Sequence, residues 1–166
     1  MEIEVIVEIP MGSRNKYELD HSSGRIRLDR TLFTATRYPS DYGFIEGTLS
    51  EDGDPLDCLV LVPEPTFPGC LISARPLGVF WMKDEKGPDA KILAVPVGDP
   101  RHQLDDLTGL PHHLLLEIGH FFEIYKDLEA GATTEVGGWE GREAAEKEIE
   151  ASRARFDRHR GSATGR

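Results

Sequence analysis

The sequence predicts a β-rich α+β fold, in which a small antiparallel β-barrel carries two packed helices near the end of the chain. Three observations support this class. Apolar and polar residues alternate at the N-terminus with the period of two that a strand requires. Short runs rich in Val, Ile and Leu then follow, broken by Gly or Pro and without a helical period. Apolar spacings of three and four begin only after residue 103, so a barrel with late helices fits better than alternating βαβ units.

The N-terminal part of the chain predicts a strand followed by a hairpin. Residues 2–9 alternate and stop before a proline, which leaves Glu8 at the end of the strand. Residues 16–20 and 25–29 alternate in the same way across four turn residues that include Gly24. Glycine readily takes the positive φ that such a turn needs, so these two segments predict a hairpin.

The middle of the chain predicts turns and then strong strands. Residues 39–55 contain three glycines and two prolines around the short segment 42–45, which is typical of turns. The following apolar runs are each expected to form a short strand. They are residues 56–62, 70–76, 78–82 and 91–97.

Two helices are expected in the last third. Apolar residues recur at spacings of three and four up to residue 128, between Pro111 and Gly131, which suit the first turn and the end of a helix of about 18 residues. A thinner apolar stripe predicts a second helix from about residue 140 to 156. The tail at 158–166 is rich in Arg, Gly and Ser and is expected to fray, so residues 1–157 form one domain.

Charge and composition limit the possible partners. The chain has 166 residues and a net charge of -11, with 19 basic and 30 acidic side chains. Because five arginines and one aspartate lie in residues 153–166, the first 152 residues carry -15. Such a body repels a nucleic-acid backbone and attracts cations. No apolar run approaches the length of a membrane span and no leader is evident, so we expect a soluble cytoplasmic protein whose two cysteines, Cys58 and Cys70, are buried thiols.

The densest acidic stretch lies in a turn directly before an apolar strand, and it contains Asp52, Asp54 and Asp57. A solvated loop is the plain alternative for such a stretch. Asp57, however, stands at the mouth of the strand, where an unpaired carboxylate would be costly, and converging carboxylates favour hard divalent cations. The stretch is no EF-hand loop, because Asp57 stands where that loop requires Gly and Pro63 where it requires Glu.

A second acidic turn precedes another predicted strand, and its stronger candidates are Asp84, Asp89 and Lys91. Strand ends of one small barrel can share a rim, where cations and hydroxyl donors would join the metal-binding carboxylates. That combination suits a polyanionic phosphate substrate. The additional rim candidates are Lys16, Arg30, Lys126, Tyr38, Tyr42 and Tyr125. The histidines 112, 113 and 120 fall on or beside the first helix and favour no zinc site.

Seven segments, in this order and spacing, resemble the soluble family I inorganic pyrophosphatases of the bacterial type. The resemblance spans about residues 3–156, and the Asp-Gly-Asp-Pro-x-Asp block is its most specific part. The segments are residues 7–10, 15–18, 28–30, 38–45, 52–57, 84–91 and 120–128.

The resemblance implies an OB-like five-stranded barrel and the hydrolysis of pyrophosphate to two orthophosphates by a metal-bridged hydroxide in direct in-line attack. It implies Mg²⁺ as the cofactor, roughly three or four ions with substrate, with Mn²⁺ or Zn²⁺ as possible substitutes and Ca²⁺ as an inhibitor. It also implies a homo-oligomer, with a hexamer as the expected state.

The resemblance further assigns a role to each matching residue. Asp54 is the general base. The metal ligands are Asp52, Asp57 and Asp89 for one ion, Asp57 again for a second, and Asp84 with Asp89 for a third, with Glu8 and Glu18 acting through water in the outer, substrate-facing part of the site. The phosphate-binding residues are Lys16, Arg30, Tyr42, Lys91, Tyr125 and Lys126, and Tyr38 is a supporting hydroxyl.

Three alternatives to this function remain open from the sequence. A non-catalytic OB-like binding module would need a basic face with exposed aromatic residues, and the predicted rim is acidic. A cation-buffering protein would leave the predicted Lys and Arg residues without a purpose. An Mn- or Zn-dependent hydrolase of polyphosphate or nucleoside triphosphates would keep the same fold. His21, in the hairpin turn, is interpreted as a plain turn residue more readily than as one that tunes the site.

Overall fold

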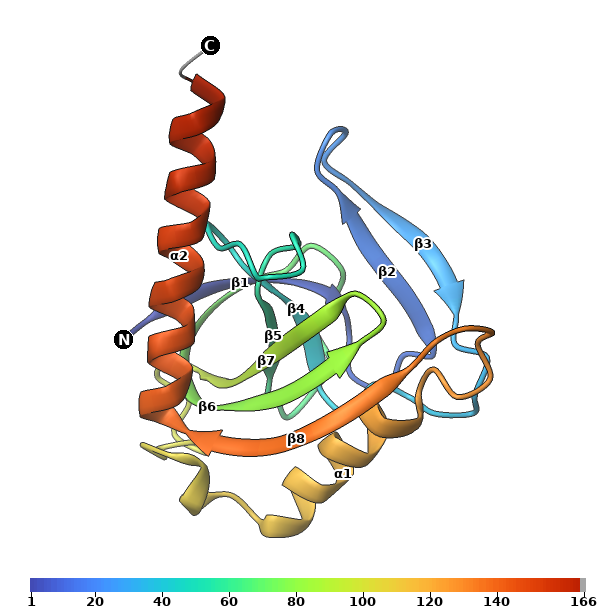
Figure 1. Cartoon of the computed structure of the whole chain (residues 1–166). Coiled ribbons are helices and arrows are strands. Elements are labelled where there is room, and N and C mark those ends of the chain that lie inside the picture. The colour runs from blue at the N-terminus through green and yellow to red at the C-terminus, as the bar shows by residue number, and fades with distance from the viewer. Residues whose placement is uncertain (165–166) are drawn as a thin grey trace.

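The computed structural model describes residues 1–164 as one barrel with helices packed on two sides (Figure 1). The barrel strands come mostly from the first 96 residues, and both long helices follow them, as the sequence predicts. The strands are β1 Ile3–Ile9, β2 Asn15–Asp20, β3 Arg25–Thr31, β4 Asp41–Ile45, β5 Asp57–Val60, β6 Leu71–Asp84, β7 Gly87–Pro96 and β8 Thr134–Gly141. The helices are the short 3₁₀ helix η1 Leu107–Gly109, α1 His112–Ile124 and α2 Arg142–Thr164.

Five strands close the barrel. The sheet runs in the order β1-β4-β5-β7-β6-β8, and an additional β1–β6 pairing closes its first five strands into a ring. The predicted antiparallel arrangement is confirmed for every pair of this ring except β5–β7, which is parallel. The chain leaves β5, passes through β6 on the far side of β7 and returns, so β7 arrives beside β5 in the same direction. Strands β2 and β3 form the predicted hairpin as a separate two-stranded sheet.

Several predicted boundaries are wrong, and each has a physical reason. The two strands expected at 70–76 and 78–82 form one strand, β6, which shifts register between Pro76 and Gly78 and so bends where we expected a break. Strand β8 lies where no strand was predicted, because its glycine-rich sequence TEVGGWEG carries little local signal and is held by pairing with β6.

The helices also differ in length from the prediction. Helix α1 has 13 residues and ends at Ile124, so Tyr125 and Lys126 lie in the turn that follows it. Helix α2 begins at Arg142 and continues to Thr164, well past the expected end near residue 156, and its Ala- and Arg-containing sequence suits a helix. In the tail that was expected to fray, residues 158–164 are helical, and positions 165 and 166 lie outside the described residues. Fraying of this tail stays a prediction.

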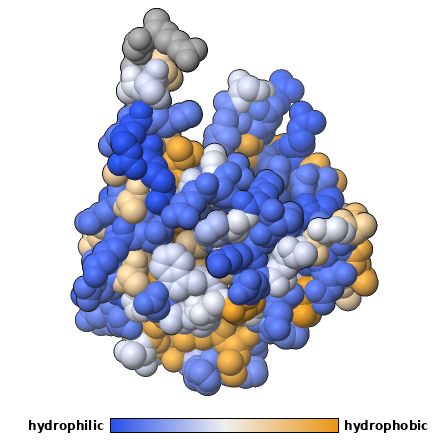
Figure 2. Space-filling model, viewed as in Figure 1, coloured by the Kyte–Doolittle hydropathy of each residue, from blue (hydrophilic) through white to orange (hydrophobic). Residues whose placement is uncertain are grey.

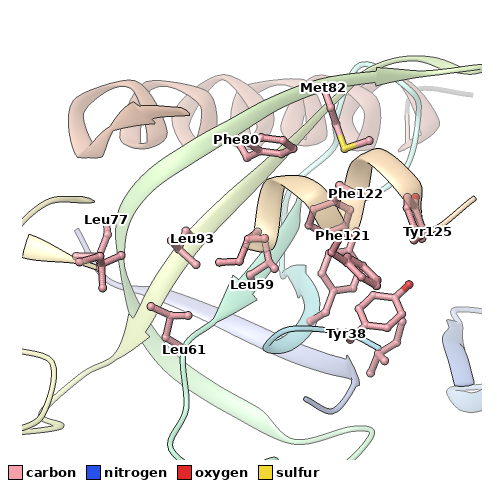
Figure 3. Packing of buried hydrophobic residues seen from close by; sticks show 14 of the residues in the cluster. Tyr38, Leu59, Leu61, Leu77, Phe80, Met82, Leu93, Phe121, Phe122 and Tyr125 are labelled. Atoms are coloured by element: carbon pink, nitrogen blue, oxygen red, sulfur yellow. The ribbon is translucent and has the colours of Figure 1, made fainter. Parts of the chain in front are cut away.

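The core has two parts, one on each helix. Side chains of α1 pack against the barrel through Ile118, Phe121 and Phe122, and Figure 3 shows the last two beside Tyr38 and Leu59. Helix α2 packs Ala145 and Ile149 against the other side of the sheet. These contacts keep the far end of the barrel free for the loops that carry the acidic clusters.

The two cysteines differ in environment. Cys58 in β5 is fully buried, as predicted, and burial raises the pKa of its thiol. Cys70 is only partly buried, so that prediction is wrong, because Cys70 lies in the turn before β6 and not within the strand. No helix in residues 1–164 is long and apolar enough to cross a membrane.

Gly43 offers a direct test of barrel closure. It pairs with Val7 on one side and Cys58 on the other, and a Cβ built there would lie 1.8 Å from the Ile6 carbonyl oxygen. We expect Gly43→Ala to lower the free energy of unfolding by about 3 kcal/mol or more, because the two strands must move apart.

Gly119→Ala in α1 is the matched control. A Cβ at Gly119 would meet only the Phe80 ring at 3.5 Å, and alanine favours a helix, so this variant should be as stable as the wild type or more stable by up to about 1 kcal/mol. Urea unfolding of both variants provides the comparison, and equal stability of Gly43→Ala and the wild type would contradict the close β1–β4 approach.

Candidate active site

A polar cavity of about 480 Å³ lies at one end of the barrel. Its walls come from the end of β1, the β2–β3 hairpin, the turn before β5, the β6–β7 turn and the segment after α1. Hydrophilic residues dominate the centre of the face shown in Figure 2. Thirteen of the fourteen predicted site residues line this cavity, although they are spread over more than a hundred positions of sequence. They are Glu8, Lys16, Glu18, Arg30, Tyr42, Asp52, Asp54, Asp57, Asp84, Asp89, Lys91, Tyr125 and Lys126.

A buried ammonium group forms the floor of the cavity. Lys91 Nζ lies 2.8 Å from Asp57 Oδ2 and 3.0 Å from both carboxylate oxygens of Asp89, and its side chain is almost completely buried. The parallel β5–β7 register pairs Asp57 directly with Lys91, and Asp89 lies two residues before Lys91 on the same face of β7. Burial alone would lower the pKa of Lys91, but the two carboxylates outweigh it and hold that pKa well above its usual value.

Aromatic rings cover this group from one side. Lys91 Nζ lies 4.9 Å from the Phe122 ring centre and donates a 2.9 Å hydrogen bond to the Tyr42 hydroxyl. That hydroxyl in turn donates to Asp57 Oδ2 at 2.6 Å. Burial, with the nearby Asp57 charge, raises the pKa of Tyr42 well above its ordinary value, so Tyr42 stays a hydroxyl donor at neutral pH.

The turn before β5 carries the first acidic cluster. The Asp52 carboxylate accepts a 3.0 Å hydrogen bond from the Asp54 amide, and burial raises the pKa of Asp52 above its ordinary value. The Asp54 side chain is 64% exposed and lies 3.7 Å from Lys86 Nζ in the β6–β7 turn. Asp54 is therefore the carboxylate of this turn that is most accessible from the cavity mouth.

The hairpin supplies cations to the opposite wall. Lys16 and Arg30 are register partners on β2 and β3, so both side chains reach the same side. Lys16 contacts Glu18 and lies 3.6 Å from Asp29, whereas Arg30 contacts Asp29 and lies 2.9 Å from Glu129. Arg30 Nε is buried and has no hydrogen-bond partner within the described chain, which leaves one strong donor available.

Glu8 ties the hairpin to the barrel. Its carboxylate accepts a 2.7 Å hydrogen bond from the Leu19 amide. Burial is the main reason why its pKa rises from 4.5 to about 7, and the Asp57 charge adds to the rise. Across the cavity, Lys126 Nζ lies 3.3 Å from Asp84 and 3.4 Å from Glu85, which joins the segment after α1 to the β6–β7 turn.

Tyr38 is the one predicted site residue that does not line the cavity. It is 2% exposed and packs behind Tyr42, with ring centres 5.3 Å apart. Figure 3 shows Tyr38 beside Phe121, whose ring centre lies 4.8 Å away. Its contact with the site therefore passes through the Tyr42 ring. His21, interpreted as a plain turn residue, lines the cavity with its ring 5.5 Å from Phe44.

Four further charged residues line the cavity that sequence reasoning did not assign to it: Asp29, Glu85, Lys86 and Glu129. Asp29 lies in the matching segment 28–30, but regular alternation would point it away from Arg30, and the bulge beside Arg30 is seen only in the structure. Glu85 and Lys86 are ordinary turn residues by their sequence. Glu129 carries no local signal at all, since only its distant partner Arg30 brings it into the wall.

Negative charge outweighs positive charge in this cavity. Ten carboxylates line it against five Lys and Arg side chains. Burial, together with the Asp57 and Asp84 charges, raises the pKa of Asp89 although Lys91 lies beside both of its carboxylate oxygens. Within residues 1–164 no three His, Cys, Asp or Glu side chains already form a metal cage. Hard oxygen donors in such excess nevertheless fit Mg²⁺ or a similar cation.

The comparisons with known proteins agree with this geometry. The family model described as inorganic pyrophosphatase matches residues 5–157. The chain belongs to the inorganic pyrophosphatase family. An inorganic pyrophosphatase of Streptomyces coelicolor is 60% identical over 157 residues, which are 94% of this chain and 96% of that protein. One from Leifsonia xyli is 54% identical, covering 93% of this chain and 95% of its own.

Solved pyrophosphatase structures share the fold. The inorganic pyrophosphatase from Thermus thermophilus superposes with a TM-score of 0.91 at 47% identity, over 94% of this chain and 91% of that chain. The one from Coxiella burnetii gives 0.90 at 48% identity, over 93% and 95%. The predicted family membership and the OB-like barrel are therefore confirmed, and the role of each residue stays a prediction.

Glu8 predicts a pH dependence of the metal-free pyrophosphatase. Because its folded pKa of about 7 exceeds the ordinary 4.5, the folded chain keeps a proton that the unfolded chain loses between these values. The contribution of the protonated Glu8 to the free energy of unfolding is therefore complete below about pH 4.5 and is lost as the pH rises through about 7. When the pH is raised from 5 to 7.5 in the presence of EDTA, the free energy of unfolding should fall by roughly 1–3 kcal/mol more in the wild type than in Glu8→Gln. Parallel pH profiles from urea unfolding would contradict the shift.

Proposed function

We propose that this chain, an enzyme that hydrolyses inorganic pyrophosphate to two orthophosphates, uses Mg²⁺ as its metal and Asp54 as its general base. One observation carries the proposal. A single cavity holds ten carboxylates together with five Lys and Arg side chains. The carboxylate excess suits several divalent cations, and the cationic side chains suit the phosphate oxygens of a highly charged anion.

The carboxylates that would hold the metals lie at three strand ends. Asp52, Asp57 and Asp89 would share one ion, Asp57 would also hold a second, and Asp84 with Asp89 would hold a third. Bound there, divalent cations lower the pKa of water and offset charge on the phosphates. Mn²⁺ or Zn²⁺ has the charge and size to substitute at oxygen ligands, with looser control of geometry.

Cationic and hydroxyl side chains orient the substrate. Lys16 and Arg30 reach the cavity from the hairpin, and Lys91 reaches it from the floor. The Arg30 Nε–H group is buried without a hydrogen-bond partner, which costs folding free energy. A bound phosphate oxygen would accept this hydrogen bond and remove the cost. Three phosphate donors remain: Tyr42 on β4, and Tyr125 and Lys126 after α1. Burial raises the pKa of Tyr125, which keeps its hydroxyl protonated.

Asp54 would accept the proton of the attacking water. Its carboxylate is exposed to the cavity, and its amide is fixed by Asp52. As the water oxygen bonds to one phosphorus, the bridging oxygen leaves with the other phosphate, and the proton passes to Asp54. The Lys and Arg side chains meet the charge that grows on the leaving phosphate. Positioning and electrostatics thus supply most of the rate enhancement.

The proposal extends to the setting of the enzyme. Pyrophosphate is the partner molecule, and an acidic body of this kind does not favour nucleic acid. The resemblance to the bacterial type of the family implies a homohexamer in the cytoplasm as the working form.

Asp54→Asn tests the general base. We expect phosphate release from pyrophosphate in Mg²⁺ to fall by at least about 100-fold in kcat, because the amide cannot take the proton. Asp105→Asn is the matched control, since Asp105 is 91% exposed and lies outside the cavity wall. EDTA should abolish the wild-type reaction. A wild-type rate unaffected by EDTA would contradict the metal requirement, and a fast Asp54→Asn enzyme would contradict the base.

Added Ca²⁺ tests whether the metal must be held in a defined geometry for hydrolysis or need only neutralise charge. Calcium takes more ligands at longer distances than magnesium, so it should occupy the same carboxylates and misplace the reacting groups. Added to a reaction with about 5 mM Mg²⁺, it should inhibit strongly, whereas NaCl of equal ionic strength should have little effect. Activation by Ca²⁺ would show that charge alone suffices.

A further inference from the structure

Helix α2 binds the backbone of the segment that carries Asp52 and Asp54. The Leu49 amide donates a 3.0 Å hydrogen bond to the Ser152 carbonyl of α2. The Leu49 carbonyl accepts a 2.9 Å hydrogen bond from Arg155 Nε. Both polar backbone groups of this one loop residue are therefore held by the helix, about a hundred positions later in the chain.

The Arg155 guanidinium is itself held in place. Its Nη2 donates to Glu148 at 2.5 Å and to Ser152 Oγ at 3.0 Å. Ser152 is completely buried, and its hydroxyl also lies 3.2 Å from Glu148. Because Glu148 and Arg155 are only 17% and 21% exposed, their ion pair is better protected from solvent than a surface pair. Arg155 thus presents a fixed donor to the loop.

Two short steps lead from Leu49 to the predicted general base. The next amide, that of Ser50, donates a 2.7 Å hydrogen bond to the Asp54 carbonyl, and the Gly53 amide donates back to the Ser50 carbonyl at 3.2 Å. The Asp54 amide then holds the Asp52 carboxylate. Side chains of the turn between Glu51 and Asp54 are exposed or half-buried, so hydrogen bonds fix this turn and apolar packing contributes little.

A separate anchor, beside Leu49, joins the two ends of the loop. Thr48 Oγ1 donates to the Ile45 carbonyl at 2.6 Å and accepts from the Leu56 amide at 2.9 Å. This closes the base of the loop on the barrel without reaching its tip. The contact with α2 adds the second point that a loop needs to be held in one orientation.

We infer that Arg155 is a positioning residue for hydrolysis, acting through Leu49 and Ser50 to hold Asp52 and Asp54 in their working places. The inference rests on the proposed roles of those two aspartates. Arg155 does not line the cavity, so its effect is on the geometry of the turn and not on substrate contact. Loss of a group that orients a metal ligand typically weakens metal binding about 10- to 100-fold.

Arg155→Ala tests the inference in the full-length enzyme. The Mg²⁺ concentration that gives half-maximal phosphate release should rise about 10-fold, and kcat at saturating Mg²⁺ should fall, with the KM for pyrophosphate nearly unchanged. Arg155→Lys should recover only part of the lost Mg²⁺ affinity and kcat, since an ammonium group cannot donate to the Leu49 carbonyl and Glu148 with the planar geometry of a guanidinium.

Two controls separate positioning from stability. Ile149→Val removes a buried methyl group from the same helix and takes away none of the hydrogen bonds to Leu49. Lys147→Ala removes an exposed side chain that pairs with Glu143. Both should keep the wild-type Mg²⁺ requirement. Urea midpoints show whether any shift in the Mg²⁺ requirement follows stability across the three variants.

Amide hydrogen exchange provides a readout that does not depend on activity. In the metal-free protein, the Ser50 and Gly53 amides should exchange faster in Arg155→Ala than in the wild type or Ile149→Val. Unchanged exchange and an unchanged Mg²⁺ requirement would overturn the inference, as would equal changes in Ile149→Val. If the wild type fails to hydrolyse pyrophosphate, the proposed function fails, and the exchange result still decides whether Arg155 holds the turn.

Discussion

The architecture depends on one buried charge, the Lys91 ammonium between Asp57 and Asp89. A buried cation without close carboxylates would cost several kcal/mol, so the fold must hold the two carboxylates beside it. The parallel β5–β7 register fixes Asp57, and the spacing of two along β7 fixes Asp89. Both strands belong to the ring that the β1–β6 pairing closes. The cavity floor is therefore built on strands of the closed barrel.

The cavity gives up stability for function. Its carboxylates outnumber its cations, and burial raises the pKa of both Glu8 and Asp89 toward neutrality. A protein selected only for stability would replace such groups with apolar ones. The aromatic residues Phe121 and Phe122 of α1 pack in the core beside the floor, so apolar packing outside the site offsets this cost (Figure 3). Divalent cations then bind where the folded chain alone is under-compensated.

Local sequence signals predicted most of this site, because its two acidic clusters lie at strand ends and strand ends of a small barrel converge. What failed needed distant partners. Strand β8 is specified by its pairing with β6, Glu129 enters the wall through Arg30, and Tyr38 is withdrawn behind Tyr42 by the aromatic core. The most specific block of the family resemblance, residues 52–57, follows Leu49, whose carbonyl accepts a hydrogen bond from Arg155, a helix residue outside the seven matching segments. Periodicity also cannot show where a helix ends, as α2 demonstrates.

The most direct test of the account is the location of bound cations. Crystals grown with Mn²⁺ and measured near its absorption edge would give an anomalous difference map of the cavity. The account predicts peaks ligated by Asp52, Asp57 and Asp89, with a further peak between Asp84 and Asp89 when a pyrophosphate analogue is present. The account would be contradicted if active enzyme saturated with Mn²⁺ gave a map with no peak beside Asp57 or Asp89, so that Lys91 alone lay between these two carboxylates.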